Sequence, residues 1–356
     1  MTPFQNNKKI DYTWAELDPR NDPRWDEYVL GHPEGTAYHH SAWAQVLSET
    51  YGYTPLFLGM TLSGTSQLAG IIPLMFVNSP LTGKRVVSLP FTAYCTPLVA
   101  EEYIEEAVRF AYNRFPKVSY VELKFLESTK GDEGQLGVAS SYVDHIISLK
   151  GDIDELFRSF HYSCVRKRVR HANKKGLTFS LGESESHLRQ IYKLIVKVRR
   201  SHGLPPQPYE LYYNIYRILL PLNLLIMPLV EFNGNIIAGG FVLKSKHIWH
   251  LEYSASDHRL LDLAPNPMLF WECIKMAHQA GANYFDLGRT SIWNNSLLEF
   301  KDRWQAKRHV IRNLYFPQNA KAPAMKKNRE ILLSMNKRLP ATLLKWIGRV
   351  LYPHMG

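Results

Sequence analysis

The sequence predicts a mixed α/β fold of the α+β class in which one arrangement of strands and helices occurs twice. Two segments, 64–74 (GTSQLAGIIPL) and 234–243 (GNIIAGGFVL), each combine a Gly-containing turn with an Ala-Gly step inside a strand-like run. A β-rich run precedes each of them, so both are predicted to complete a β-hairpin. The offset of about 170 residues indicates a weak internal repeat. A chance likeness is the alternative, because hairpins with Gly turns are common.

Each predicted hairpin is followed by a strand, a helix and a second strand. These elements span 86–90, 101–115 and 118–125 in the first half, and 248–256, 266–280 and 284–287 in the second. The helix of the second half is well supported, because Asn266 can cap it, Pro267 suits its first turn and Gly281 can end it. No long heptad pattern is present, so no coiled-coil arm is expected.

A polar, Gly-rich stretch at 128–141 separates the two halves. We therefore predict an N-terminal domain over 1–135, a C-terminal domain over 136–317 and a basic tail over 318–356. The tail holds eight Lys and Arg residues against one Glu, and an apolar stripe runs along its last part. That pattern is typical of a helix that lies on a membrane surface, the alternative being a helix packed back on the domain. The stripe consists of Leu343, Leu344, Ile347 and Leu351, with Lys345 and Arg349 opposite.

The composition is that of a globular protein, with 356 residues, 45% hydrophobic and 21% charged. Its three cysteines are far apart and form no CxxC pair, so neither a metal site nor a redox motif is predicted. The N-terminus lacks the apolar core of a signal peptide, and no apolar run approaches the roughly 20 residues that span a bilayer. We expect a cytoplasmic protein. The net charge of +11 favours polyanionic partners, namely tRNA, phosphorylated substrates or anionic lipid, and we expect no DNA partner.

The stretch 284–304 (YFDLGRTSIWNNSLLEFKDRW) holds the candidate catalytic residues. Asp286 and Arg289 lie at the C-terminal end of a predicted strand, where ligands bind in open α/β sheets. Asp286 is also the candidate general base. Lys301, which follows Phe300, could stabilise the oxyanion formed in acyl transfer. The alternative is that Asp286 and Arg289 pair in a turn while Lys301 is a solvated surface residue.

Two basic clusters are candidate anion-binding sites. Arg166 and Arg170 lie on one face of a predicted helix at 152–175, within a stretch that has no acidic residue between positions 156 and 182. Phosphate would relieve the mutual repulsion of this face, and a solvated helix face is the alternative. Arg200 and His202 end another predicted helix, where they either face a ligand or stabilise the helix dipole.

Three further residues are candidates for lining a substrate groove. Tyr94 follows Pro90 in a strand-like segment, and a proline there indicates a bulge or an edge that could open a groove. Glu252 and Tyr253 occupy the matching segment of the second half. Strand alternation is expected to place only one of these two on each face of the sheet.

Several segments together resemble the FemAB-like branch of the GNAT-fold superfamily. They are 166–177 (RKRVRHANKKGL), 199–208 (RRSHGLPPQP), 266–289 (NPMLFWECIKMAHQAGANYFDLGR) and 299–304 (EFKDRW), together with HSAWAQVLSETYGY, LAGIIPL and SLPFTAY in the first half. The resemblance covers roughly residues 38–316. It implies two tandem GNAT-like domains, in agreement with the internal repeat.

Known members of this branch move an aminoacyl group from tRNA to a lipid-linked or nucleotide-linked muropeptide. Others accompany exopolysaccharide systems and are described only as acyltransferases, and this chain is more similar to these. The resemblance implies transfer of an activated acyl or aminoacyl group to an amine or hydroxyl of a cell-envelope glycan or peptidoglycan precursor. Phe300-Lys301 matches the family's Phe-Lys pair, whose lysine stabilises the developing oxyanion. The resemblance also implies an acceptor that carries phosphate and a location at the inner face of the cytoplasmic membrane.

The acyl donor is expected to be a co-substrate, either aminoacyl-tRNA or acyl-CoA, with no bound cofactor. GNAT enzymes cradle the CoA pyrophosphate in a Gly-rich turn, and the equivalent segment here, 257–265, contains no glycine. This disfavours CoA. One alternative function is an acyl-CoA-dependent N- or O-acetyltransferase of exopolysaccharide biosynthesis. Another is a non-catalytic protein that binds RNA or a membrane.

Overall fold

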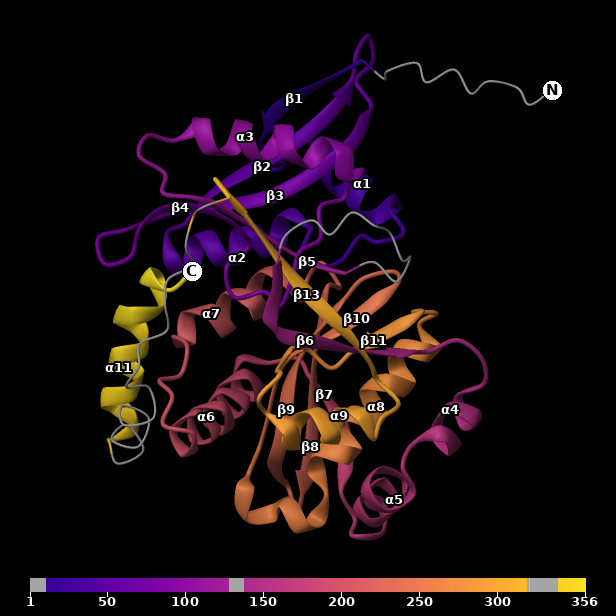
Figure 1. The fold of residues 1–356 in the computed structure, drawn as a ribbon. Helices are drawn as coiled ribbons and strands as arrows, with labels where there is room; N and C mark the ends of the chain where they lie inside the picture. The colour runs from indigo at the N-terminus through magenta and orange to yellow at the C-terminus, as the bar shows by residue number, and fades with distance from the viewer. Residues whose placement is uncertain (1–10, 128–137, 319, 321–338) are drawn as a thin grey trace, which may run out of the picture.

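The structure, a computed structural model, describes residues 11–127, 138–318, 320 and 339–356 (Figure 1). A single mixed sheet of thirteen strands runs through both halves of this part of the chain. Of the predicted boundary at 128–141, residues 128–137 lie outside the described residues, and residues 138–141 belong to a strand. The elements of the first half are β1 (Tyr12–Leu17), α1 (Arg24–Gly31), α2 (Ser41–Tyr51), β2 (Thr54–Leu62), β3 (Leu68–Ser79), β4 (Gly83–Ser88), a 3-10 turn (Glu101–Tyr103), α3 (Ile104–Arg114) and β5 (Val121–Leu126).

The second half contains more helices. Its elements up to the second hairpin are β6 (Val138–Ser148), α4 (Ile153–Ser159), a π-helical turn (Tyr162–Arg166), α5 (Lys167–Lys174), β7 (Thr178–Gly182), α6 (Glu185–Ser201), α7 (Tyr209–Asn214), a second π-helical turn (Ile215–Leu219), β8 (Leu225–Phe232) and β9 (Asn235–Lys244). The later elements are β10 (Ile248–Ser256), a 3-10 segment (His258–Leu263), α8 (Pro265–Gln279), β11 (Tyr284–Asp286), β12 (Thr290–Ser291), α9 (Asn295–Asp302), β13 (Lys307–Phe316), α11 (Ala341–Leu351) and a 3-10 turn (Tyr352–His354).

The internal repeat predicted from the sequence is present. In the first half β2, β3 and β4 are antiparallel neighbours, and α3 crosses over to β5, which pairs with β4 in parallel. In the second half β8, β9 and β10 repeat this order, and α8 crosses over to β11, which is parallel to β10. The mixed fold class is therefore confirmed. β13 lies between β5 and β6 and pairs with both, which makes the sheet continuous across the two halves.

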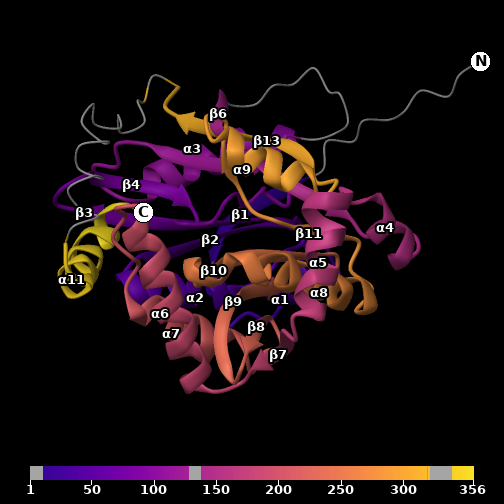
Figure 2. The same cartoon turned by 90° about the horizontal axis from the view of Figure 1, so that it is seen from below.

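Helices cover both faces of the sheet in each half. α3 packs on one face of the first half, and α5 and α8 pack on one face of the second. On the opposite faces, α1 and α2 share a single hydrophobic core with α6 and α7, so the two halves are joined by packing as well as by the sheet. Seen from below, α5 and α8 lie on one side of the C-terminal strands, while α6 and α7 lie on the other (Figure 2).

The single helix predicted over 152–175 is wrong, because the chain breaks it at Phe160. This residue has an extended backbone, with φ −65° and ψ 152°, and its ring is fully buried against Trp271 and Trp304. The His161 side chain then accepts a hydrogen bond from the N–H of Cys164 and caps the next helical turn. Burial of one large aromatic side chain therefore outweighs continuation of the helix.

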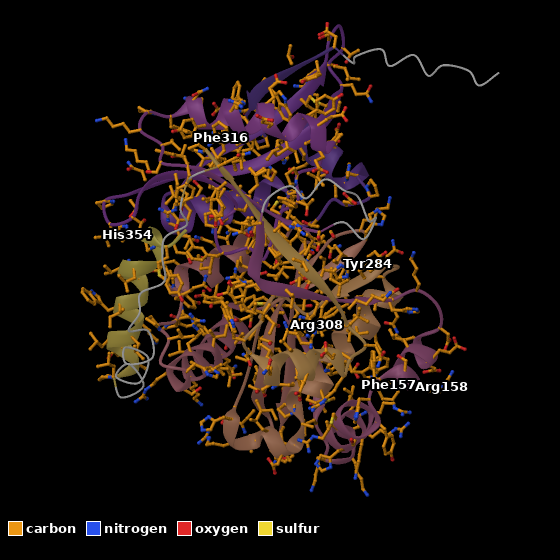
Figure 3. All side chains as sticks on the ribbon, viewed as in Figure 1. Phe157, Arg158, Tyr284, Arg308, Phe316 and His354 are labelled. Atoms are coloured by element: carbon orange, nitrogen blue, oxygen red, sulfur yellow. The ribbon has the colours of Figure 1, made fainter. Side chains whose placement is uncertain are left out.

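The C-terminal helix α11 and the turn after it contact both halves of the protein. Leu344 and Gly348 are buried against the loop between α6 and α7, where the backbone of Pro206 approaches Gly348. At the other end, Thr82 donates a hydrogen bond to the carbonyl of His354 (2.7 Å), and the buried Arg85 donates to the carbonyl of Gly356. Figure 3 shows His354 beside the N-terminal half. None of the helices that the structure describes is both long and apolar enough to cross a membrane.

The close approach at Gly348 predicts that Gly348→Ala weakens the docking of α11. The carbonyl of Pro206 occupies the space of an added Cβ. Overpacking costs about 1–3 kcal/mol, which outweighs the roughly 1 kcal/mol that Ala gains over Gly inside a helix. Denaturant unfolding should show a lower free energy of unfolding for Gly348→Ala than for Val350→Ala, a change at an exposed position of the same helix. Equal or greater stability of Gly348→Ala would contradict this docking.

Candidate active site between the two halves

A cavity of about 380 Å³ lies where β10 and β11 separate. The two strands pair in parallel over three positions and the pairing ends at His250 and Asp286. Just beyond, β10 carries a bulge between Leu251 and Tyr253. A β-bulge re-aims side chains, and here Glu252 and Tyr253 both line the cavity, so the expected alternation does not hold. The remaining walls come from α6 and the loop after it, from α8 and α9, from the N-terminal half and from the turn after α11.

His250 and Asp286 form a buried dyad at the base of this cavity. Each side chain is about 2% exposed, and His250 Nδ1 lies 2.8 Å from Asp286 Oδ2. The carboxylate accepts the proton of Nδ1, which leaves Nε2 as the basic nitrogen. Nε2 has no hydrogen-bond partner among the described residues, and His250 lines the cavity. The dyad can therefore take a proton from a bound group.

The backbone after β11 also donates a hydrogen bond to Asp286. Gly288 has φ +78°, a conformation that suits glycine, and its N–H donates to Asp286 Oδ1 at 2.5 Å. Tyr94 donates to Oδ2 at 3.3 Å. Burial alone would raise the pKa of Asp286, but the hydrogen bond from His250, together with that from the Gly288 N–H, lowers it below its ordinary value.

Lys301 is buried, so the alternative of a solvated surface lysine is wrong. Its side chain is about 6% exposed and lies at the end of α9, which Asn294 caps. Nζ donates to the carbonyls of Gly288 (2.5 Å) and Arg289 (3.3 Å). An ammonium group has three N–H donors, so one remains for an oxygen in the cavity. Burial lowers the pKa of Lys301 to about 8, against the opposing effect of nearby carboxylates.

Phe300 and Arg289 also line the cavity. The ring of Phe300 packs edge-on against Phe270, with centroids 5.9 Å apart. Arg289 does not pair with Asp286, contrary to the alternative considered from the sequence. Its guanidinium lies 5.0 Å from the ring centroid of Tyr142.

A second carboxyl group, Asp144 on β6, is buried next to the dyad. Neither of its oxygens has a hydrogen-bond partner within the part of the chain that the structure describes. Burial, followed by the charge of Asp286, raises the pKa of Asp144 well above its usual range. The pKa of Asp144 is thus shifted upward and that of Asp286 downward, so the first proton is lost more easily from Asp286 than from Asp144. Sequence reasoning missed this residue, whose only signal is a single Asp within an apolar strand.

The N-terminal half contributes two tyrosines to the site. Tyr38 donates a hydrogen bond to the carboxylate of Glu252, and Tyr94 reaches Asp286. Burial raises the pKa of Glu252 to about 6, although the hydrogen bond from Tyr38 opposes this. The cavity is thus built from both halves of the chain, and neither half alone would hold Glu252 and Asp286 in this way.

The first half does not repeat the cavity, because its own chain fills the equivalent space. Beyond the parallel pairing of β4 and β5, the N–H of Cys95 donates to the carbonyl of Lys124 (2.9 Å), and the N–H of Leu126 donates to Thr96 Oγ1 (3.2 Å). The segment that closes this gap also carries Tyr94 toward Asp286. Among the described residues, the repeat in the second half therefore has a cavity between its parallel strands, and the repeat in the first half has none.

Four basic candidates from the sequence do not line the cavity. Arg166 lies over the ring of Tyr162, and Arg170 lies over Phe157, which Figure 3 places at the outer edge of the C-terminal half. Arg200 and His202 are exposed at the end of α6. The residue beside them lines the cavity instead.

That residue is Arg199. It donates a hydrogen bond of 2.5 Å to the hydroxyl of Tyr352, from the turn after α11. It also donates to the carbonyl of Pro205 at 3.2 Å. Both Arg199 and Tyr352 line the cavity, so the C-terminal segment completes its wall and holds a guanidinium group there.

Comparisons with known proteins place this arrangement in a known fold. Residues 159–302 match the family model described as an acetyltransferase (GNAT) domain. The crystal structure of FemX superposes with a TM-score of 0.67 at 14% identity, over 86% of this chain and 98% of that one. A search of the curated proteins finds no match.

Two further solved structures share the fold. A tandem GNAT protein from the clavulanic acid biosynthesis pathway has a TM-score of 0.52 at 9% identity, over 88% of this chain and 100% of that one. A C-terminal DUF2156 domain from Agrobacterium fabrum has a TM-score of 0.51 at 13% identity, over 90% and 96% of the two chains. The matched domain identifies the chain as an acyltransferase, and the likenesses to solved structures show that its fold is that of tandem GNAT proteins.

Proposed function

We propose that this protein transfers an activated acyl or aminoacyl group to an amine or hydroxyl of a cell-envelope glycan or peptidoglycan precursor. The observation that carries the proposal is the buried dyad of His250 and Asp286. His250 lines the same cavity as Lys301, and its buried Nε2 has no hydrogen-bond partner among the described residues. A base and an oxyanion donor in one cavity are the two groups that acyl transfer requires.

The proposed reaction follows from these two groups. Nε2 of His250 removes a proton from the acceptor's amine or hydroxyl as that group attacks the acyl carbonyl. The remaining N–H of Lys301 stabilises the oxyanion. When the carbonyl re-forms, the bond to the leaving group breaks, and the imidazolium returns its proton to that group. Asp286 acts through His250, because it fixes the ring and stabilises the imidazolium. It is thus a positioning residue rather than the base.

The charges around the cavity support an acceptor that carries phosphate. Arg199 and Arg289 both line the cavity, and a guanidinium group matches phosphate oxygens in geometry and charge. Nucleotide-linked and lipid-linked glycan precursors carry phosphate close to the sugar. Glu252, held by Tyr38, supplies a carboxyl group that can bind an acceptor amine. We place this reaction in the cytoplasm, at the inner face of the cytoplasmic membrane, where such precursors are made.

The donor is better described as an aminoacyl ester than as acyl-CoA. GNAT enzymes bind the CoA pyrophosphate with backbone N–H groups where the helix after the central strand begins. Here that helix is α8, and Pro265 and Pro267 remove two of its first three N–H donors. The N–H of Met268 is already bonded to the carbonyl of Ala264 (3.3 Å). The residues present at this helix start do not fit a pyrophosphate.

Binding of the two donors side by side tests this proposal. At a fixed, moderate salt concentration, we expect purified protein to bind aminoacyl-tRNA more tightly than uncharged tRNA. Titration with acetyl-CoA is expected to show no saturable binding, since the amide donors are missing. Fluorescence anisotropy for tRNA and calorimetry for CoA would measure both. Saturable CoA binding without a preference for charged tRNA would overturn the choice of donor and favour acyl-CoA chemistry.

A further inference from the structure

Helix α11 has a second apolar face that the protein leaves uncovered among the described residues. Its inner face, with Leu344 and Gly348, packs on the domain. On the outer side, Leu343 is 42% exposed, Trp346 is 62% exposed and Val350 is 43% exposed. These three are spaced by three and four residues, so they form one stripe along the helix. The stripe predicted from the sequence was a different one, made of Leu343, Leu344, Ile347 and Leu351. In the structure Leu344 packs on the domain, as the alternative of a packed helix predicted, and the exposed stripe includes Trp346 and Val350.

Basic residues border this stripe. Lys345 and Arg349 lie one helical turn apart beside it, and they line a groove of about 560 Å³ between α11, α6 and α7. Four cations and one acid line the groove, namely Arg189, Lys193, Lys345, Arg349 and Glu210, together with Tyr192, Pro208, Tyr209 and Trp346. Glu210 lies 3.4 Å from Arg349, and Glu185 lies 2.5 Å from Arg189, which leaves Lys193 and Lys345 without an ion pair among the described residues. An anionic partner fits this groove.

We propose that the outer face of α11 docks on an anionic lipid bilayer. Leu343, Trp346 and Val350 would enter the interfacial layer, where tryptophan is favoured. The basic groove would then lie over lipid phosphates, which attract lysine and arginine near the surface. A second copy of this chain fits less well, because a two-fold contact through this face would bring the same cations together.

The docking face is directly connected to the candidate active site. Tyr352 follows α11 immediately, lines the cavity and binds Arg199 through its hydroxyl. A protein docked through α11 would therefore hold the cavity close to the bilayer. Docking rests on the exposed stripe and the groove, and it stands whether or not the proposed transfer reaction does.

Co-sedimentation with vesicles tests the docking. The full chain should bind vesicles of phosphatidylcholine mixed with phosphatidylglycerol, bind vesicles of phosphatidylcholine alone weakly, and lose binding as salt rises. We expect Trp346→Ser, and separately the double variant Lys345→Glu with Arg349→Glu, to weaken binding by about tenfold or more. Trp293→Ser is the matched control, because Trp293 is 73% exposed on the turn before α9, away from this face.

Three results of these binding measurements would contradict docking on an anionic bilayer. Equal loss in Trp346→Ser and Trp293→Ser, or equal binding to both kinds of vesicle, would overturn it. A dimer of the wild-type protein that Trp346→Ser dissolves would assign the face to a second copy instead. Thermal melts of all variants identify any loss that comes from unfolding. The vesicles contain neither acyl donor nor acceptor, so a negative result leaves the proposed transfer function standing.

Discussion

The His250→Gln variant is expected to transfer acyl groups about 10²–10⁴-fold more slowly than the wild-type protein. The amide of Gln can still donate to Asp286, so the buried carboxylate keeps a partner, but Gln cannot take a proton from the acceptor. His250→Ala would be a poorer test, since it leaves Asp286 buried without its main partner, a change that costs about 3–5 kcal/mol in comparable cases. The measurement is single-turnover transfer of labelled amino acid from charged tRNA to a nucleotide-linked muropeptide.

Two further variants give this prediction its controls. His258→Ala changes an exposed histidine of the 3-10 segment after β10 and should leave the rate unchanged. Asp286→Asn should slow transfer while leaving donor binding intact, because Asn can hold the wrong tautomer of His250. A His250→Gln enzyme that keeps wild-type single-turnover rates would remove the dyad from the mechanism and leave proximity of the two substrates as the main source of rate.

The parts of this site that are local in the chain could be predicted from the sequence. Asp286, Arg289 and Lys301 lie within sixteen consecutive positions, and strand, turn and cap signals place them at one end of the sheet. The internal repeat was also readable, because hairpin and crossover patterns recur at a fixed spacing. These local patterns predicted the order of strands and helices in the C-terminal half and the residues of one wall of the cavity.

The dyad could not be predicted, because its two members meet only through strand register. His250 and Asp286 are 36 residues apart and become neighbours because β10 and β11 pair with these two positions opposite each other. Shifting the register by one residue would turn one side chain to the other face. Neither strand alone specifies that register, so the sequence indicated no carboxylate–histidine pair.

Contacts between the two halves of the chain could not be predicted from the sequence either. Tyr38 is 214 residues from Glu252, and Tyr94 is 192 residues from Asp286. These pairs form because the N-terminal half packs against the cavity of the C-terminal half. The basic candidates Arg166 and Arg170 failed for a related reason, because their helical segment does not line the cavity and their guanidinium groups lie over aromatic rings of that same segment.

Replacing Lys301 by Met is expected to lower the single-turnover rate by about 10²–10³-fold, the usual effect of removing one oxyanion donor. Met keeps the apolar stem and the approximate volume but has no ammonium group. The wild-type rate should also fall as the pH rises through about 8, because burial lowers the pKa of Lys301 to that value and only the protonated form stabilises an oxyanion. The Met variant should lack this alkaline limb.

A purely structural role for Lys301 predicts a different result. Its two hydrogen bonds to the carbonyls of Gly288 and Arg289 also fix the turn after β11, so any substitution could reduce activity through that turn. Lys301→Cys alkylated with 2-bromoethylamine restores an amine at the same reach, and its sulfur lowers the pKa of that amine. If activity recovers and its alkaline decrease occurs at a lower pH than in the wild-type protein, the titrating group is this side chain. Recovery with an unchanged limb would mean that Lys301 only holds the turn and that another group titrates in the cavity.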